Sequence, residues 1–185
     1  GDVKLGTVTV VLPAPEPEPE PEPGPMDAFI DVPVSVHNRG TDKALCTLHN
    51  SGDSAYKGNQ EQVIQFDYYG NSTQNWRFEP VGDGLFRIIN TFDNRALCTL
   101  HNSDDSGYAG NMEEVILYDY YGNSTQHWAV VPVDGGFAIL NAHDGRALCT
   151  ENLVSSPNYK GNQEPMILYD FEEGDLTMVW DLELQ

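Results

Sequence analysis

The sequence predicts an all-β protein made of three copies of one unit of about 50 residues. The copies occupy residues 44–76, 96–128 and 147–180, and each begins with the letters ALCT and ends with a tryptophan. The tryptophans, at positions 76, 128 and 180, lie 52 residues apart in both intervals, and the cysteines, at positions 46, 98 and 149, lie 52 and 51 residues apart. A repeat of this length indicates copies of one supersecondary unit that bury a shared core.

Each unit carries four short apolar or alternating runs, separated by residues that favour turns. In the middle copy the runs cover residues 86–89, 96–100, 115–120 and 128–131. We expect Pro132 to end the last run, because proline cannot donate a ladder hydrogen bond. Four strands in each of three repeats make twelve strands. The apolar residues of the repeats do not recur at the spacing of an α-helix. A chain of sheet alone must close on itself or stack to protect its strand edges.

Composition supports a packed core and excludes several kinds of partner. Hydrophobic residues make up 39% of the 185 residues and aromatics 10%, which is enough for a folded domain. The 29 acidic and 9 basic side chains give a formal charge of −20, which repels phosphate backbones, so we expect no nucleic-acid partner. No apolar run approaches the roughly 18 residues of a membrane helix, so we expect no membrane insertion.

The three cysteines, one at the same place in each repeat, do not form the even pairs of a disulfide scaffold. We expect Cys46, Cys98 and Cys149 to be small buried apolar residues inside the ALCT strands. A three-thiolate metal site is the alternative, but it lacks a fourth ligand. Residues 102–107 resemble part of a calcium loop without its spaced glutamate, and we interpret them as a solvated acidic turn. The sequence therefore predicts no metal and no cofactor.

The N-terminal residues lie outside the repeats. Residues 1–12 alternate polar and apolar side chains at positions 8–10, which predicts the tail of a preceding domain or an additional strand. Residues 13–25 alternate proline with glutamate, which predicts an extended, semi-rigid linker. The repeat domain then covers residues 26–185, with repeats at about 34–85, 86–136 and 137–185. We interpret the chain as part of a larger protein with a covalently linked N-terminal domain.

A short segment ending in Gln-x-Trp occurs at residues 70–76 (GNSTQNW) and 122–128 (GNSTQHW), and in degraded form at 174–180 (GDLTMVW). These segments resemble the Gln-x-Trp repeat of the ricin B-type (R-type) lectins, whose fold is the β-trefoil. The resemblance covers roughly residues 34–185 and rests on the motif, the number of copies, the repeat period and the number of strands. We expect the tryptophans to line a common core, while Gln74 and Gln126 hold nearby backbone groups.

The resemblance implies carbohydrate binding, usually of galactose-type sugars, in shallow pockets with up to one per repeat. A sugar pocket needs planar polar groups for the hydroxyls and an aromatic face for the apolar side of the ring. The first two repeats share the run Asp-Tyr-Tyr-Gly-Asn-Ser-Thr-Gln, which the third has lost, so we expect two sites. The candidate binding residues are His49, Asn50, Asp67, Tyr68, Tyr69, Asn71, Gln74, His101, Asn102, Asp119, Tyr120, Tyr121, Asn123 and Gln126.

The lectin pattern is altered at several positions. Lectins of this family usually carry an aspartate two positions after the first cysteine, where this chain has Leu48 and Leu100. Their stacking tryptophan aligns with Asp67 and Asp119. Either the pockets have been rebuilt at shifted positions, or sugar binding has been lost. For a single residue such as Asn71, a purely turn-forming role fits the sequence equally well.

We therefore predict a non-catalytic carbohydrate-binding module that targets a larger secreted or cell-surface protein to glycans. The alternative is a protein-interaction or inhibitor-type trefoil that no longer binds sugar. An enzyme has the least support, because the sequence contains no recognisable catalytic triad, metal-ligand cluster or phosphate loop.

Overall fold

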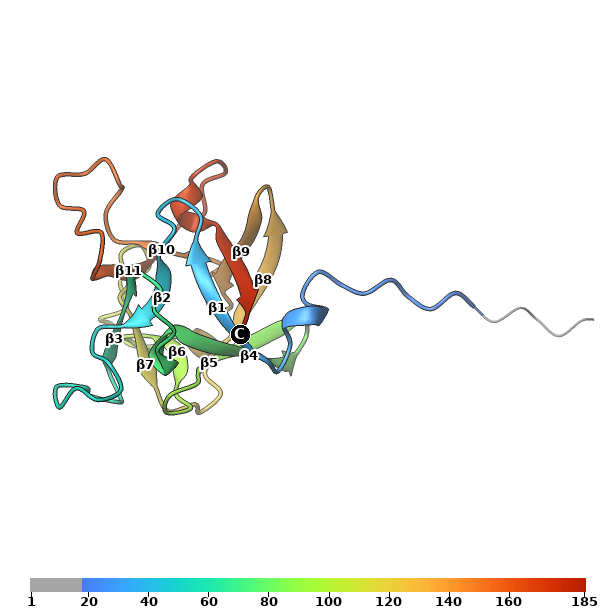
Figure 1. The fold of residues 1–185 in the computed structure, drawn as a ribbon, viewed down its shortest axis with the longest axis horizontal. Helices are drawn as coiled ribbons and strands as arrows, with labels where there is room; N and C mark the ends of the chain where they lie inside the picture. Colours follow the sequence, from blue (N-terminus) through green and yellow to red (C-terminus); the bar gives the residue numbers. More distant parts are fainter. Residues whose placement is uncertain (1–17) are drawn as a thin grey trace, which may run out of the picture.

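The computed structural model describes residues 18–185 and confirms an all-β protein of twelve strands (Figure 1). The additional strand expected within residues 1–12 and the first part of the Pro-Glu segment lie outside the described residues. Residues 18–24 have no regular structure and are exposed, and in Figure 1 they lead away from the body of the fold. The chain enters the core at Met26, which is buried.

The strands are short and fall into three sets of four, as the apolar runs predict. The described residues form four single turns of 3-10 helix, so no helix in residues 18–185 is long enough to cross a membrane. The strands are β1 (Pro33–Asn38), β2 (Ala44–Thr47), β3 (Glu61–Phe66), β4 (Asn75–Gly82), β5 (Leu85–Asn90), β6 (Ala96–Thr99), β7 (Val115–Tyr118), β8 (Trp128–Val133), β9 (Gly136–Asn141), β10 (Ala147–Thr150), β11 (Glu164–Tyr169) and β12 (Trp180–Leu184). The turns are η1 (Asp27–Phe29), η2 (Ser72–Gln74), η3 (Ser124–Gln126) and η4 (Leu176–Met178).

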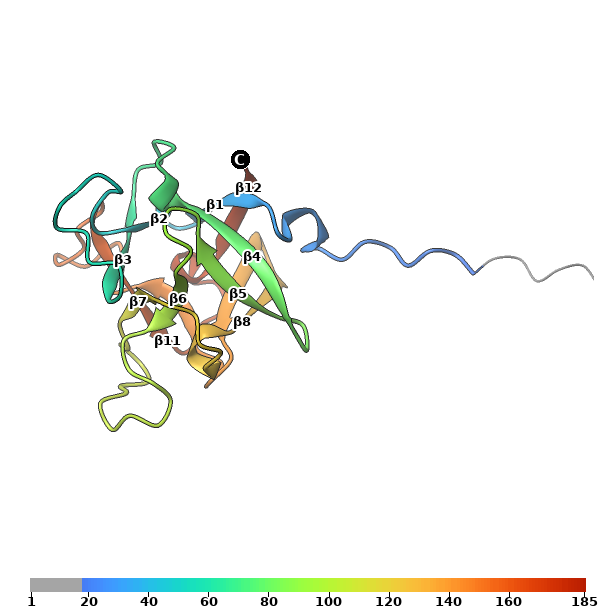
Figure 2. The ribbon, with the colours of Figure 1, turned by 90° about the horizontal axis from the view of Figure 1, so that it is seen from below.

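Six of the strands close an antiparallel barrel. Strand β1 pairs with β4 and β12, β4 pairs with β5, β5 with β8, β8 with β9, and β9 with β12. Closure leaves the barrel without an open sheet edge along this ring. Figures 1 and 2 show these strands on the side from which the N-terminal segment leaves.

The other six strands form three hairpins that cap one end of the barrel. The hairpins are β2–β3, β6–β7 and β10–β11. Strand β3 also pairs with both β7 and β11, and an isolated bridge between Glu114 and Ile167 joins the remaining two hairpins. A barrel of six strands under a triangle of three hairpins is the β-trefoil arrangement that the Gln-x-Trp resemblance implies.

The three tryptophans lie in one core, as predicted. Trp76, Trp128 and Trp180 are fully buried, and each stands at or near the start of a barrel strand. Their indole nitrogens donate to the carbonyls of Leu45, Leu97 and Leu148 at 3.0, 3.1 and 3.0 Å. Each bond ties a barrel strand to the cap hairpin of the same repeat, and it satisfies a polar group that burial would otherwise penalise.

One strand boundary differs from the prediction. Pro132 does not end its strand, because β8 continues to Val133 and Pro132 is paired with Phe137 of β9. Strand β5 pairs with β8 only at Trp128 and Ala129, so this end of β8 has no neighbour on its second side. A proline there removes no ladder hydrogen bond, as at a sheet edge.

The structure confirms that the cysteines are free and buried. Burial raises the pKa of Cys46 and Cys149 to about 12 and that of Cys98 to about 11. A thiol with a raised pKa stays protonated, and so unreactive, until the pH approaches that value.

We therefore expect native protein to resist alkylation by iodoacetamide at pH 8, whereas unfolded protein should take up three labels. Mass spectrometry of both samples checks this. Rapid labelling of the native chain would contradict the placement of the thiols inside the ALCT strands.

Candidate functional site

Each repeat contains one hollow beside its cap hairpin. The hollow lies between the end of the first hairpin strand, the long loop that follows it, and the end of the second strand. In the first repeat it measures about 270 Å³ and is lined by Cys46, Thr47, Leu48, Asn50, Asp53, Phe66, Tyr69 and Gln163. In the second it measures about 260 Å³ and is lined by Gln60, Cys98, Thr99, Leu100, Asn102, Asp105, Ile116, Tyr118 and Tyr121.

A buried glutamate holds the loop that walls each hollow. In the first repeat, Glu61 accepts bonds from the backbone N–H groups of His49 and Lys57 at 2.7 and 3.0 Å. In the second, Glu113 accepts from His101 and Ala109 at 2.8 and 2.9 Å. Each carboxylate is almost completely buried, and such charge-assisted bonds are stronger than neutral ones. The glutamate therefore fixes both ends of the loop.

The third repeat keeps the same anchor. Glu164 accepts from the backbone N–H groups of Asn152 and Lys160 at 2.6 and 2.8 Å. The three hollows therefore share one frame, and differences between them come from the side chains that line them.

Two predicted site residues meet in the first hollow, and their equivalents meet in the second. The hydroxyl of Tyr69 donates to Asn50 Oδ1, and that of Tyr121 donates to Asn102 Oδ1. Both tyrosines are half exposed. The bond orients each amide so that its NH₂ group can donate elsewhere, while the phenol oxygen can still accept.

Sequence reasoning missed an aspartate in each of these hollows. Asp53 and Asp105 lie in the acidic loops and line the first and second hollows. One carboxylate oxygen of each accepts a backbone N–H, from Ala55 and Gly107, both at 2.8 Å. One feature of the sequence could have identified them: each aspartate lies seven residues after the cysteine of its repeat. The third repeat has Ser156 at this position.

Aromatic pairs form one side of the two hollows. Phe66 and Tyr69 pack edge to face with ring centroids 6.0 Å apart, and Tyr118 and Tyr121 do the same at 6.0 Å. This geometry is favourable for aromatic rings and holds each tyrosine in place. Partial burial raises the pKa of both Tyr69 and Tyr121, so that their hydroxyls stay protonated at neutral pH.

The predicted histidines bind the buried glutamates instead of lining the hollows. His49 Nδ1 lies 2.9 Å from Glu61 Oε1, and His101 Nδ1 lies 3.0 Å from Glu113 Oε1. In the third repeat Asn152 takes this place and donates to Glu164 at 2.9 Å. These side chains therefore belong to the loop anchor.

Gln74 and Gln126 are fully buried and hold the backbone, as the motif suggests. Gln74 accepts from the N–H of Tyr69 at 2.9 Å and donates to the carbonyl of Asp67 at 2.9 Å. Gln126 makes the equivalent bonds to Tyr121 and Asp119 at 2.9 and 3.0 Å. They bend the chain so that Tyr69 and Tyr121 reach the hollows, but they offer no exposed group to a ligand.

Asn71 and Asn123 cap the 3-10 turns η2 and η3. Each Oδ1 accepts from the backbone N–H and the hydroxyl of the threonine two residues later, Thr73 or Thr125, at 3.0 and 2.9 Å. Asp175 makes the same cap in the third repeat. A cap of this kind stabilises the turn whether or not a ligand is bound.

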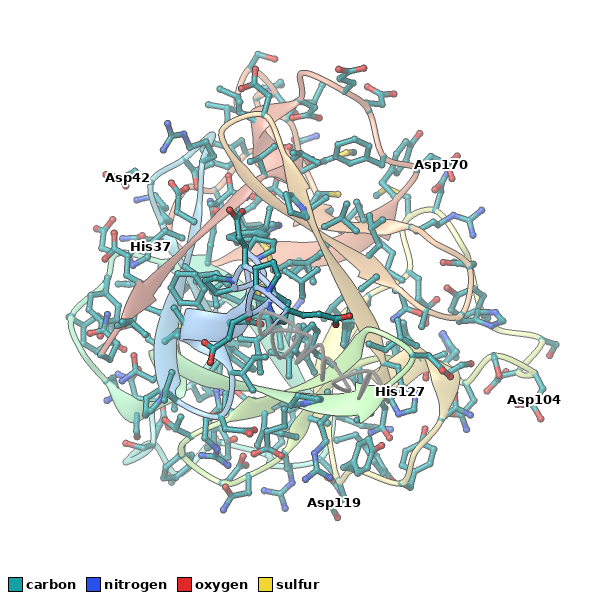
Figure 3. All side chains as sticks on the ribbon, turned by 90° about the vertical axis from the view of Figure 1, so that its right-hand side faces the viewer. His37, Asp42, Asp104, Asp119, His127 and Asp170 are labelled. Atoms are coloured by element: carbon teal, nitrogen blue, oxygen red, sulfur yellow. The ribbon has the colours of Figure 1, made fainter. Side chains whose placement is uncertain are left out.

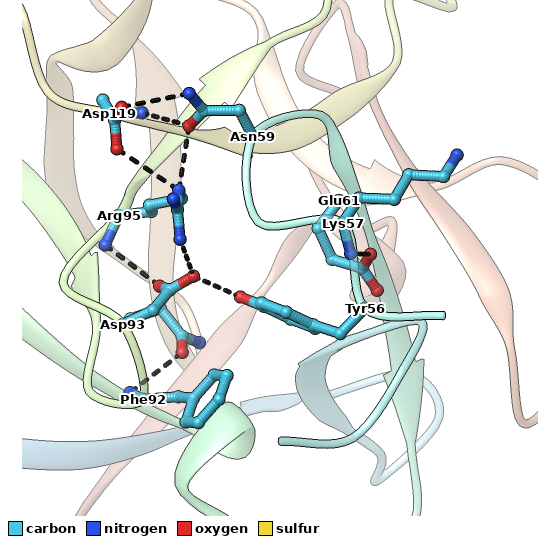
Figure 4. Close-up of polar contacts among 9 residues, drawn as sticks. Tyr56, Lys57, Asn59, Glu61, Phe92, Asp93, Arg95 and Asp119 are labelled. Atoms are coloured by element: carbon cyan, nitrogen blue, oxygen red, sulfur yellow. Dashed lines mark hydrogen bonds and ion pairs between the residues drawn. The ribbon is translucent and has the colours of Figure 1, made fainter. Parts of the chain in front are cut away.

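Asp67 and Asp119 lie at the seams between repeats, and Figure 4 shows the seam around Asp119. Asp119 accepts from Asn59 Nδ2 at 3.0 Å and pairs with Arg95 at 3.2 Å, while Arg95 also pairs with Asp93 at 2.5 Å. Asp67 pairs with Lys43 at 2.6 Å, and the bonds from Lys43 and Asn162 lower its pKa.

The third seam is built in the same way around Asp170, which pairs with Arg146 at 3.4 Å and accepts from Asn111 at 2.9 Å. Seen from the side of the N-terminal segment, Asp119 and Asp170 lie at the periphery of the molecule (Figure 3). Because the arrangement occurs in all three repeats, these aspartates have a shared role in joining them.

Tyr68 and Tyr120 point away from the hollows. The hydroxyl of Tyr68 donates to Gln185 Oε1 at 2.6 Å, and that of Tyr120 lies 2.8 Å from His127 Nε2. Arg87 stands 4.7 Å above the ring of Tyr120, a cation–π geometry. Of the fourteen predicted site residues, the hollows thus bring together Asn50 with Tyr69 and Asn102 with Tyr121.

The hollow of the third repeat has a different lining. It measures about 280 Å³ and is lined by Met112, Cys149, Thr150, Glu151, Leu153, Ile167, Tyr169, Glu172, Asp175, Thr177 and Met178. Leu153 replaces the asparagine, and Glu172 replaces the tyrosine of the other two hollows. This hollow therefore lacks the amide-hydroxyl pair.

Comparison with known proteins supports the resemblance found in the sequence. Residues 72–158 match the family described as ricin-type beta-trefoil lectin domain-like. No curated protein matches the chain. The expected resemblance to the ricin B-type lectins is thereby confirmed for residues 72–158.

Solved structures share the fold. The designed threefold-symmetric protein ThreeFoil is 27% identical, with a TM-score of 0.67 over 83% of this chain and 98% of its own. An exo-β-1,3-galactanase from Clostridium thermocellum is 23% identical, with a TM-score of 0.66 over 84% of this chain and 30% of its own. The C-half of the earthworm R-type lectin, solved in complex with GalNAc, is 12% identical, with a TM-score of 0.58 over 83% of this chain and 99% of its own.

The loop anchor leads to a stability prediction. Replacing Glu61 by Ala leaves the backbone N–H groups of His49 and Lys57 without their acceptor, so we expect the free energy of unfolding to fall by about 3 kcal/mol. At this chain length that corresponds to a melting temperature lower by roughly 6–12 °C. Thermal and urea unfolding followed by circular dichroism measure both quantities.

Asp104→Ala is the control, because Asp104 is exposed in the corresponding loop of the second repeat. It should change stability by less than about 0.5 kcal/mol. Equal stability of the Glu61→Ala variant and the parent would contradict the anchoring role.

Proposed function

We propose that this chain, whose residues 72–158 match the ricin-type beta-trefoil lectin domain-like family, binds carbohydrate without catalysis. The binding sites are the hollows of the first and second repeats. The observation that carries the proposal is the pair of equivalent amide–phenol contacts, Asn50 with Tyr69 and Asn102 with Tyr121. The lectin-like fold supports carbohydrate binding in general, and this pair supports its placement.

The polar groups of each hollow match the needs of neighbouring sugar hydroxyls. In the second hollow, Asn102 supplies an NH₂ donor, and Tyr121 and Asp105 supply oxygen acceptors. The aromatic edge of Tyr121 and Tyr118 offers an apolar surface for the C–H face of a sugar ring. Direction-dependent bonds beside an apolar face are the usual composition of a specific small-ligand site.

The hollows favour one terminal sugar unit. At about 260 and 270 Å³ they are smaller than the roughly 300–1,000 Å³ pockets that enclose a drug-sized ligand. We assign galactose-type sugars as the ligand class, which the GalNAc complex of the earthworm lectin and the activity named for the galactanase support.

Two equal, weak sites on one rigid body would act together on a polymeric or surface-bound glycan. A single shallow site with a dissociation constant near 1 mM corresponds to about −4 kcal/mol. When both sites reach one ligand surface, the second binding event becomes intramolecular, and the overall affinity rises by orders of magnitude. The module therefore gains affinity from valence.

We extend the proposal to the larger protein: the module targets a secreted or cell-surface partner domain, linked through the Pro-Glu segment, to glycans. The exposed, irregular chain at residues 18–24 is suited to such a linker. The galactanase, of which the matching region forms 30%, supports a modular arrangement of this kind.

A glycan array probed with the full chain, followed by calorimetry on the strongest galactose-terminated ligand, tests the proposal. We expect two equivalent sites, and Asn102→Leu should reduce the stoichiometry to one. The substitution is structurally mild, because the third repeat carries Leu153 at this position. Adding Asn50→Leu should abolish binding, and the affinity of the parent should change little with salt, since hydroxyl recognition releases few counterions.

Asn123→Asp and Asn71→Asp are the matched controls, because the third repeat uses Asp175 for the same cap. Both controls should retain two sites. Undiminished binding by the Asn50→Leu and Asn102→Leu double variant, or no binding of the parent to any glycan, would contradict the proposed function.

A further inference from the structure

The third hollow has exposed aliphatic side chains, Met112 and Leu153, that the other two hollows lack. Met112, Leu153 and Tyr169 line its hollow and are all exposed, and Val154 beside them is exposed as well. The first and second hollows have glutamine where the third has Met112, namely Gln163 and Gln60. They have asparagine where the third has Leu153, namely Asn50 and Asn102. Contiguous exposed apolar side chains in a hollow are typical of an interaction site.

Carboxylates surround this apolar floor. Glu151, Glu172 and Asp175 line the hollow, where the first repeat has Leu48, Tyr69 and Asn71 at the equivalent positions. Among residues 18–185, no ion pair involves any of these three carboxylates. The rim is therefore negative, and within residues 18–185 none of its three carboxylates is neutralised by an ion pair.

The pKa of the neighbouring Glu114 also reflects the negative charge around this hollow. Glu114 pairs with Ile167, which lines the hollow, and its pKa is raised by partial burial and then by the charge of Glu151. Like charges so placed repel each other, and a bound cation would relieve the repulsion.

We infer that the hollow of the third repeat docks a basic segment of a partner protein. An arginine or lysine side chain contacts the rim of Glu151, Glu172 and Asp175, while an aliphatic neighbour packs on Leu153 and Met112. Two features favour this occupant over the alternatives. A second copy of the chain would bring a further −20 of charge to a negative rim. A neutral sugar would find Leu153 and Glu172 where the other hollows offer an amide and a phenol.

Peptide docking and sugar binding use separate surfaces, because the third hollow has no lining residue in common with the other two. The module would thus hold a glycan at two repeats and a protein at the third.

The test uses fluorescence anisotropy of the full chain with a labelled peptide that alternates leucine and arginine, at physiological salt. We expect the double variant Glu151→Gln with Glu172→Gln to bind about tenfold more weakly. Leu153→Asn, which installs the residue of the other repeats, should weaken binding about fivefold. A peptide with serine for leucine, and one with citrulline for arginine, should each bind more weakly than the original.

Matched controls separate docking from general attraction to an acidic protein. Glu20→Gln with Glu22→Gln removes the same charge from the exposed N-terminal segment. Leu184→Asn alters a side chain that is 59% exposed, against 60% for Leu153. Both controls should bind the peptide within about twofold of the parent.

Three results would overturn the inference. The Glu20 and Glu22 control could weaken binding as much as the Glu151 and Glu172 variant, which would mean non-specific charge attraction. The serine peptide could bind as well as the leucine peptide, which would mean that Leu153 and Met112 do not contribute to binding. Chitosan oligosaccharides could bind through Glu151 and Glu172 more tightly than the peptide, and the ligand would then be a cationic amino sugar.

Discussion

The fold depends on one buried contact made three times: the indole N–H of a barrel tryptophan donates to the carbonyl of a leucine in the cap hairpin. Trp76, Trp128 and Trp180 reach back 31, 31 and 32 residues to make it. In a dry core the indole has no other partner, so the contact fixes both the barrel strand and the ALCT strand. The 3-10 turn that precedes each tryptophan is held in place by the same contact. The wall of the hollow, which adjoins this turn, is positioned as a result.

The buried glutamates hold the loops in place, as the tryptophans hold the strands. Glu61, Glu113 and Glu164 each accept two backbone N–H groups four and twelve residues earlier in the chain, so the loop closes on a charge rather than on side-chain packing. The loop sequence is then free to differ. The first two repeats use this freedom for asparagine and aspartate, and the third has leucine and serine at the same loop positions. A constant frame with variable lining explains how one repeated unit can carry two kinds of surface.

Much of the fold could be predicted from the sequence, because the period, the Gln-x-Trp segments and the apolar runs depend on local patterns. The site was less accessible. Asn50 and Tyr69, which meet in the first hollow, can be singled out from the sequence because both have copies in the second repeat. The seam position of Asp67 depends on Lys43 and on Asn162, which lies 95 residues away, and no local pattern shows that contact. Asp53 was passed over because an acidic loop is usually just solvated, and only its repetition at Asp105 distinguishes it. Pro132 was expected to end a strand, since the sequence does not show which strand edge lacks a neighbour.

The central claim is that the amides facing the hollows, rather than those capping the turns, contact the sugar. The side-chain NH₂ signals of asparagine can be followed by ¹⁵N–¹H NMR while N-acetylgalactosamine is added to the labelled chain. The account predicts that the signals of Asn50 and Asn102 shift in parallel and saturate together, while those of Asn71 and Asn123 stay in place. Shifts confined to Asn71 and Asn123, or to residues around Leu153, would contradict it.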